Sequence, residues 1–151
     1  MRVGKTTSII LPAEKKSLTK VRDFADKYGE KFGYNMRQVN GFRLSLDEIC
    51  TNIVMYAYED RPTPGDIRIE ITRQLDSVVT RIIDNGRHFD YSTVVDPDLN
   101  RYINEQRQGG LGIYLVRQLN ESVQYERVGN SNILTLSNKV KPSSIFSISF
   151  V

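Results

Sequence analysis

The chain has 151 residues, 39% of them hydrophobic and 26% charged, which suits one globular domain with its own core. The net charge of +3 comes without a dense Lys/Arg block, so nucleic-acid binding is not indicated, and no apolar run approaches the ~20 residues that cross a bilayer. The single cysteine, Cys50, excludes an intramolecular disulfide, and the N-terminus lacks a signal-peptide core, so we expect a cytoplasmic protein.

The first part of the chain predicts a strand and two amphipathic helices. Residues 8–11 form a short apolar run that suits a strand, and residues 14–32 carry apolar side chains at helical spacing up to Gly33. A main helix is expected to begin near residues 37–40 and to run to about Tyr58. Its core stripe consists of Phe42, Leu46, Ile49, Cys50, Ile53 and Ala57.

The middle of the chain predicts a β-hairpin followed by a long loop. Residues 66–75 alternate between apolar and polar side chains, and residues 78–83 form the second strand, which ends in the turn sequence Asp84-Asn85-Gly86. Residues 88–108 are polar and predict a long loop, with a short helix around residues 99–103.

The last part predicts a helix, a second hairpin and a tail. The helix opens at Gly109-Gly110-Leu111-Gly112, and residues 123–128 and 133–137 are strands around a turn at 129–132. A β-rich tail at about residues 139–151, uncharged from Ser144 onward, is expected to add an edge strand or to pack on a partner. The last helix is expected to direct four side chains to the core, namely Leu111, Leu115, Val116 and Leu119.

The mixture of helices and hairpins predicts an α+β fold, a two-layer sandwich in which helices cover one face of a mostly antiparallel sheet. We expect one domain over residues 1–151.

Two side chains of the main helix suggest chemistry. Glu48 and Asn52 are four residues apart, so they lie on the same flank of a helix. A carboxylate there can accept a proton, and an amide oxygen can bind a hard cation. The same pair also occurs on ordinary solvated helix faces, so both interpretations stand at this point.

Two glycine-containing motifs follow. Asp84-x-Gly86 after a strand is either a simple turn or a site where a buried aspartate accepts a hydrogen bond from an exocyclic amine, with Gly86 letting a ring approach the backbone. The glycines at 109–112 either form a hinge and helix cap or offer backbone N–H groups to phosphate oxygens at a helix start. The loop between the two motifs would then close over a ligand as a lid.

With these groups in this order and spacing, the sequence resembles the GHKL ATPase superfamily of gyrase, chaperone, histidine kinase and mismatch-repair ATPases. Within it, the chain is most similar to the small anti-sigma-factor serine/threonine kinases of bacteria. Residues 47–52 match the N box, residues 84–90 the first glycine box and residues 109–116 the second. The similarity extends over about residues 6–138 and implies a Bergerat-type ATP-binding fold.

The resemblance implies a role for each matching position. Asn52 would coordinate Mg²⁺ that bridges the phosphates of ATP, and Glu48 would act as general base on the attacking hydroxyl. Asp84 would accept the adenine amino group, Gly86 would line the adenine pocket, and Thr135 would complete the adenine contact. The phosphates would be held at the helix start by Gly109, Gly110, Leu111 and Gly112.

The sequence also departs from parts of the superfamily. Tyr56 stands where many relatives carry a histidine one turn past the asparagine. The single histidine, His88, lies on no separate dimerisation helix, which argues against a histidine kinase, and 151 residues are too few for the transducer domain of gyrase-type enzymes. Arg107 is either a solvated loop residue or a contact to the terminal phosphate.

The expected function is an ATP-dependent, Mg²⁺-dependent protein serine/threonine kinase. It would hold a sigma factor inactive, phosphorylate a STAS-type antagonist and form a homodimer, without direct nucleic-acid or membrane contacts. Two alternatives remain open: a nucleotide-gated binding module without significant kinase activity, and an interaction domain that binds no nucleotide.

Overall fold

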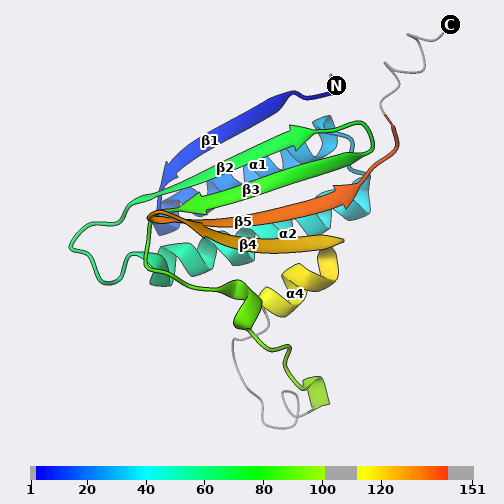
Figure 1. The fold of residues 1–151 in the computed structure, drawn as a ribbon. Coiled ribbons are helices and arrows are strands. Elements are labelled where there is room, and N and C mark those ends of the chain that lie inside the picture. The colour runs from blue at the N-terminus through cyan, green and yellow to red at the C-terminus, as the bar shows by residue number, and fades with distance from the viewer. Residues whose placement is uncertain (1–2, 101–111, 143–151) are drawn as a thin grey trace, which may run out of the picture.

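The computed structural model describes residues 3–100 and 112–142 as two layers, a sheet and the helices that cover one of its faces (Figure 1). This confirms the predicted α+β sandwich. The strands are β1 (Thr6–Pro12), β2 (Asp66–Arg73), β3 (Ser77–Asp84), β4 (Ser122–Val128) and β5 (Ser131–Lys139). The helices are α1 (Leu18–Lys31), α2 (Met36–Asn52) and α4 (Gly112–Leu119), with short turns of helix at η1 (Lys15–Ser17), η2 (Ile53–Ala57) and η3 (Tyr91–Thr93).

The sheet is antiparallel throughout, with the order β1-β2-β3-β5-β4. Hairpins pair β2 with β3 and β4 with β5, while β3 and β5 meet only after the chain has passed through α4. Because side chains alternate across a strand, the even-numbered residues of β3 and β5 face the helices. The register places Asp84 opposite Asn132, at the edge of the sheet where β3 ends and β5 begins.

The main helix α2 begins at Met36, one residue before the predicted window, because Asn35 caps it. The Asn35 side chain accepts from the Gln38 N–H at 2.8 Å, and the Gln38 side chain accepts from the Asn35 N–H at 3.1 Å. The predicted core stripe is buried from Phe42 to Ile53. Beyond Asn52 the α-helix widens into the π-helical turn η2, which leaves Ala57 only partly buried.

Two local predictions were wrong. The turn between β4 and β5 consists only of Gly129 and Asn130, because the positive φ of 57° at Gly129 reverses the chain tightly, and residues 131–132 already belong to β5. Leu119 is 38% exposed, since the helical period directs Ile113 and Val116 to the core and leaves Leu119 at the side of α4. Of the short helix predicted at 99–103, residues 99–100 are helical and the rest lies outside the described residues, as does the tail from residue 143.

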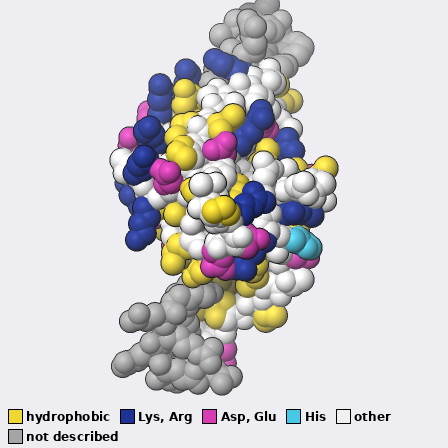
Figure 2. All heavy atoms as spheres, turned by 90° about the vertical axis from the view of Figure 1, so that its left-hand side faces the viewer, with side chains coloured by type: hydrophobic (Ala, Val, Ile, Leu, Met, Phe, Trp, Pro, Cys, Tyr) yellow, Lys and Arg dark blue, Asp and Glu magenta, His cyan; other side chains and the backbone are white. Residues whose placement is uncertain are grey.

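Basic and acidic side chains are mixed on the surface seen in Figure 2, in keeping with the net charge of +3. Figure 2 shows the end of the molecule at which β3 terminates, where Lys and Arg side chains lie among acidic and apolar ones. Within residues 3–100 and 112–142, no helix has both the length and the apolar character needed to cross a membrane.

Candidate functional site

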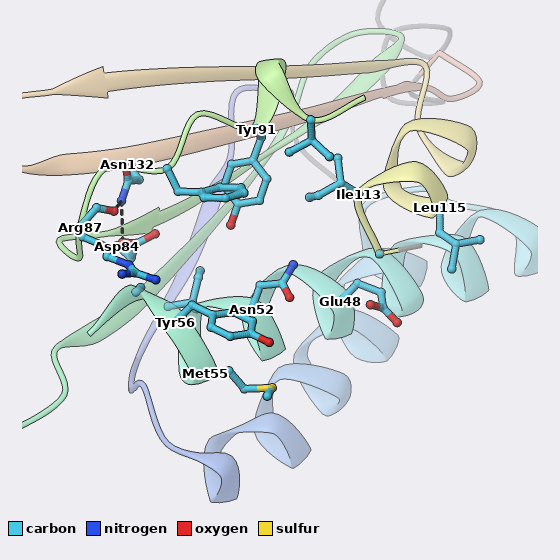
Figure 3. A pocket seen from close by; sticks show the side chains of 15 residues that line it. Glu48, Asn52, Met55, Tyr56, Asp84, Arg87, Tyr91, Ile113, Leu115 and Asn132 are labelled. Atoms are coloured by element: carbon cyan, nitrogen blue, oxygen red, sulfur yellow. Dashed lines mark hydrogen bonds between the residues drawn. The ribbon is translucent and has the colours of Figure 1, made fainter. Parts of the chain in front are cut away.

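A cavity of about 810 Å³ lies between the helix layer and the ends of β3 and β5. Its floor is formed by α2 and η2, one end by Asp84 and Asn132, and the other by Glu48 and the start of the described part of α4 (Figure 3). Asn52 lies between the two ends. The cavity therefore has an acidic end beside the sheet and a second polar end beside two helices.

Asp84 is the buried acid at the sheet end, only 4% exposed. Its Oδ1 accepts from the Gly86 N–H at 2.8 Å and from Asn132 Nδ2 at 2.9 Å. Among the described residues, no donor contacts Oδ2 of this carboxylate, so that oxygen remains available to a ligand. Burial raises the pKa of Asp84, opposed by the hydrogen bonds from Asn132 and Gly86 and by the charges of Arg127 and Arg61.

Gly86 is the residue at which the loop after β3 presses against the π-helical turn. A Cβ on Gly86 would lie 2.6 Å from the Cβ of Ala57 and 2.7 Å from its carbonyl carbon, so no side chain fits. The Arg87 N–H donates to the Ala57 carbonyl at 2.9 Å, and the Asn85 N–H donates to the Tyr58 hydroxyl at 2.9 Å. These contacts hold the loop, and with it Asp84, against the helix that carries Asn52.

Glu48 and Asn52 are both partly buried and line the cavity from the same flank of α2. A Cβ on Gly112 would lie 2.8 Å from Glu48 Oε2 and 3.9 Å from Asn52 Nδ2, so α4 passes directly over both side chains. The structure thus brings together four residues predicted from sequence, which lie in three separate segments: Glu48, Asn52, Asp84 and Gly112.

Thr135 does not line this cavity. It is an odd-numbered residue of β5, between the buried Leu134 and Leu136, so its side chain points to the opposite face of the sheet. The cavity wall is formed instead by Asn132, three residues earlier and buried. The glycine-containing sequence at 129–132 predicts a turn that includes Asn132, whereas alternate positions counted back from the apolar residues 134 and 136 indicate the helix-facing side.

The cavity also has apolar walls that were not predicted from the sequence. Tyr91 and Ile113 line it from η3 and α4, and burial raises the pKa of Tyr91. Tyr56, the position predicted to replace a histidine, is 49% exposed at the rim. Residues 109–111, predicted to contact phosphates, lie outside the described residues, as does Arg107, for which the sequence allows a solvated loop position or a phosphate contact.

Arg117 of α4 holds the segment after β3 in place. Its guanidinium donates to the Val94 carbonyl at 2.6 Å, to Asp96 Oδ1 at 2.9 Å and to the Tyr91 carbonyl at 2.6 Å. Tyr91 is thereby fixed as a wall of the cavity.

The donor set of the cavity suits a weakly coordinated hard cation. In the part of the chain that the structure describes, no group of three or more His, Cys, Asp or Glu side chains gathers to form a protein cage for a metal. Mg²⁺ commonly takes only one or two protein oxygens and completes its shell with phosphate oxygens and water. The Asn52 amide oxygen fits that requirement.

Comparison with known families matches residues 11–138 to the histidine kinase-like ATPase domain. The serine-protein kinase RsbW of Bacillus mycoides strain KBAB4 is 28% identical over 118 residues, which cover 76% of this chain and 72% of that protein. The serine-protein kinase RsbW of Bacillus velezensis is 26% identical over 134 residues, which cover 85% of this chain and 81% of that protein.

Two solved structures share the fold. The RsbU and RsbW domains of Rv1364c from Mycobacterium tuberculosis superpose with a TM-score of 0.62 at 14% identity, covering 92% of this chain and 34% of that one. The histidine kinase domain of the Erythrobacter litoralis EL346 blue-light-activated kinase superposes with a TM-score of 0.54 at 17% identity. The match covers 86% of this chain and 62% of that one. The chain thus spans about a third of the first structure and less than two thirds of the second.

Proposed function

The chain belongs to the histidine kinase-like ATPase domain family, and from this premise we propose that it binds Mg-ATP and transfers the terminal phosphate to a serine or threonine of a partner protein. The observation that carries the proposal is that Glu48, Asn52 and Asp84 line one cavity, with a carboxylate at each end. The names of the RsbW relatives, which are serine-protein kinases, support the same reaction.

In this proposal the purine lies at the sheet end of the cavity. Asp84 Oδ2 accepts the exocyclic amino group, and Gly86, which packs against Ala57 and does not line the cavity, holds the loop that carries Asp84. Tyr91 and Ile113 exclude water from the apolar part of the nucleotide. The triphosphate then extends along α2 toward Asn52 and Glu48.

The phosphates lie at the helix end. Mg²⁺, when bound, neutralises phosphate charge and aligns the terminal group, and Asn52 would hold it through its amide oxygen. Glu48 accepts the proton of the attacking hydroxyl. The hydroxyl oxygen bonds to the terminal phosphorus as the bond from that phosphorus to the bridging oxygen of ADP breaks. Gly112 allows α4 to approach these groups, since a Cβ there would lie 2.8 Å from Glu48 Oε2 and would displace the carboxylate.

The proposed partners rest on the resemblance of the three sequence boxes. We propose that the protein holds a sigma factor inactive and phosphorylates a STAS-type antagonist, as a cytoplasmic homodimer built from one domain. Residues 109–111 would contribute further phosphate contacts, and the tail from residue 144 would contribute an edge strand or a partner contact.

The test is phosphotransfer from radiolabelled Mg-ATP to a candidate STAS protein. Glu48→Gln is expected to lower the rate by roughly 10²- to 10⁴-fold while ATP still binds, because general-base assistance is lost and the shape of the cavity is kept. Glu30→Gln, on the exposed end of α1, is the matched control and should react at the wild-type rate.

Each other outcome has a definite meaning. An unchanged rate in Glu48→Gln would refute the role of the carboxylate as base. Binding of ATP without any transfer, to every STAS protein tried, would favour a nucleotide-gated binding module instead of a kinase.

A further inference from the structure

Asn132 is saturated with hydrogen bonds from the protein. Its Nδ2 donates to Asp84 Oδ1 and to the Arg87 carbonyl, both at 2.9 Å. Its Oδ1 accepts from the Tyr125 hydroxyl at 2.8 Å and from Arg127 Nη1 at 3.0 Å. A carboxamide has two N–H groups and two oxygen lone pairs. All four are therefore occupied, and Asn132 has no polar capacity left for a ligand although it lines the cavity.

Arg127 fixes which way round the Asn132 amide lies. A guanidinium only donates hydrogen bonds, so the end of the amide that faces Arg127 must be the oxygen. Arg127 is itself held by the Gly86 carbonyl at 2.9 Å. The amide cannot flip without placing its N–H groups against the guanidinium, and its Nδ2 is therefore held toward Asp84.

This arrangement decides which face Asp84 shows to the cavity. Oδ1 of the carboxylate meets two donors, the Gly86 N–H and Asn132 Nδ2, so a proton cannot sit on that oxygen. Among the described residues, no donor contacts Oδ2, and as a carboxylate oxygen it accepts a hydrogen bond. A 6-aminopurine presents a donor at this point, whereas a 6-oxopurine presents a second acceptor, which the carboxylate repels.

We propose that Asn132, anchored by Arg127, is a positioning residue that sets the preference of the cavity for 6-aminopurine over 6-oxopurine nucleotides, acting through Asp84 and forming no hydrogen bond to the base itself. The inference rests on the proposed nucleotide-binding function and deepens it. Arg127 does not line the cavity, so its effect on base preference passes through Asn132, through the Gly86 loop or through its charge on Asp84.

The experiment measures the dissociation constants of Mg-ATP and Mg-ITP by calorimetry on the full chain. Asn132→Leu, which nearly keeps the shape, is expected to lower the ATP-over-ITP preference about tenfold, the size of effect that follows from losing the alignment of one hydrogen bond to a charged group. Arg127→Met keeps the aliphatic stem of a partly exposed residue and is expected to shift the preference about threefold in the same direction.

The readout is the ratio of the Mg-ITP to the Mg-ATP dissociation constant, because a loosened cavity would weaken the binding of both nucleotides alike. Gln124→Leu, an exposed amide on the other face of β4, is the matched control and should leave the ratio unchanged. If Asn132→Leu does not fold, Asn132→Ser takes its place, because Arg127→Met also removes a charge that acts on Asp84. A wild-type ratio in the variants that fold overturns the inference but leaves ATP binding intact. Failure of the wild-type protein to bind either nucleotide overturns the proposed function, and the inference with it.

Discussion

Replacing Asp84 with asparagine is the sharpest test of the acidic end of the cavity. The substitution keeps the size of the side chain and changes one oxygen into an amide. Because the Gly86 N–H and Asn132 Nδ2 are both donors, the new amide must turn its oxygen toward them. Its NH₂ group then faces the cavity, and the acceptor offered to a ligand becomes a donor.

The magnitude follows from two losses. The hydrogen bond between the adenine amino group and a carboxylate is worth about 1.5–3 kcal/mol, and two opposed donors left unsatisfied cost about 1–3 kcal/mol more. A total of about 2.5–6 kcal/mol corresponds to roughly 10²- to 10⁴-fold weaker ATP binding. ITP, whose 6-oxygen accepts, should bind the variant no worse than the wild type. Calorimetry with both Mg-nucleotides measures the effect.

The same variant should be at least as stable as the wild type. Both hydrogen bonds to the side-chain oxygen remain, and a buried charge is removed. Since burial raises the pKa of Asp84, the folded state binds this proton more readily than the unfolded state. The Asp84 contribution to folding therefore becomes less favourable as pH rises through the interval between the ordinary and the raised pKa. The advantage of Asp84→Asn in thermal melting should grow over that interval.

Two results would refute this reasoning. ATP affinity in Asp84→Asn within about threefold of the wild-type value would show that the carboxylate does not contact the base. Loss of ATP and ITP binding together, with a lowered melting temperature, would show that Asp84 supports the fold of the loop and does not read the nucleotide.

Three further variants probe the rest of the site. Gly86→Ala should lower the free energy of unfolding by about 1–3 kcal/mol and abolish ATP binding, because a Cβ there collides with Ala57. Urea denaturation measures the first effect and calorimetry the second. Wild-type values in both would refute the close approach of Gly86 to Ala57. Arg117→Met should weaken ATP binding about tenfold, because Tyr91 loses the hydrogen bond that holds it in the cavity wall. An unchanged dissociation constant for ATP would show that the position of Tyr91 does not affect nucleotide binding. Thr135→Val should leave ATP affinity unchanged, since the side chain lies on the other face of the sheet; a tenfold loss would favour the sequence-based assignment.

Much of this protein could be predicted from its sequence because the responsible interactions are local. The alternation in residues 66–75 predicts a half-buried strand, and the apolar spacing from Phe42 to Ile53 predicts the buried stripe of α2. The four-residue spacing of Glu48 and Asn52 alone places them on one flank of a helix. The order of the three boxes was enough to indicate the ATPase family, which the match over residues 11–138 shows.

Tertiary structure decided what depends on pairing between distant segments. The register of β3 on β5 sets Asp84 beside Asn132, although the two are 48 residues apart. A two-residue turn at Gly129, shorter than the predicted one, begins β5 at Ser131, and the strand's alternation puts Asn132 in the cavity wall and Thr135 on the far face. Periodicity is a property of neighbours in the chain, whereas strand register and the approach of α4 to Glu48 result from the packing of the whole sandwich. The sequence alone therefore determined most of the elements and the ATPase family, and only the fold determined that Asn132 donates a hydrogen bond to the acid at the end of the cavity.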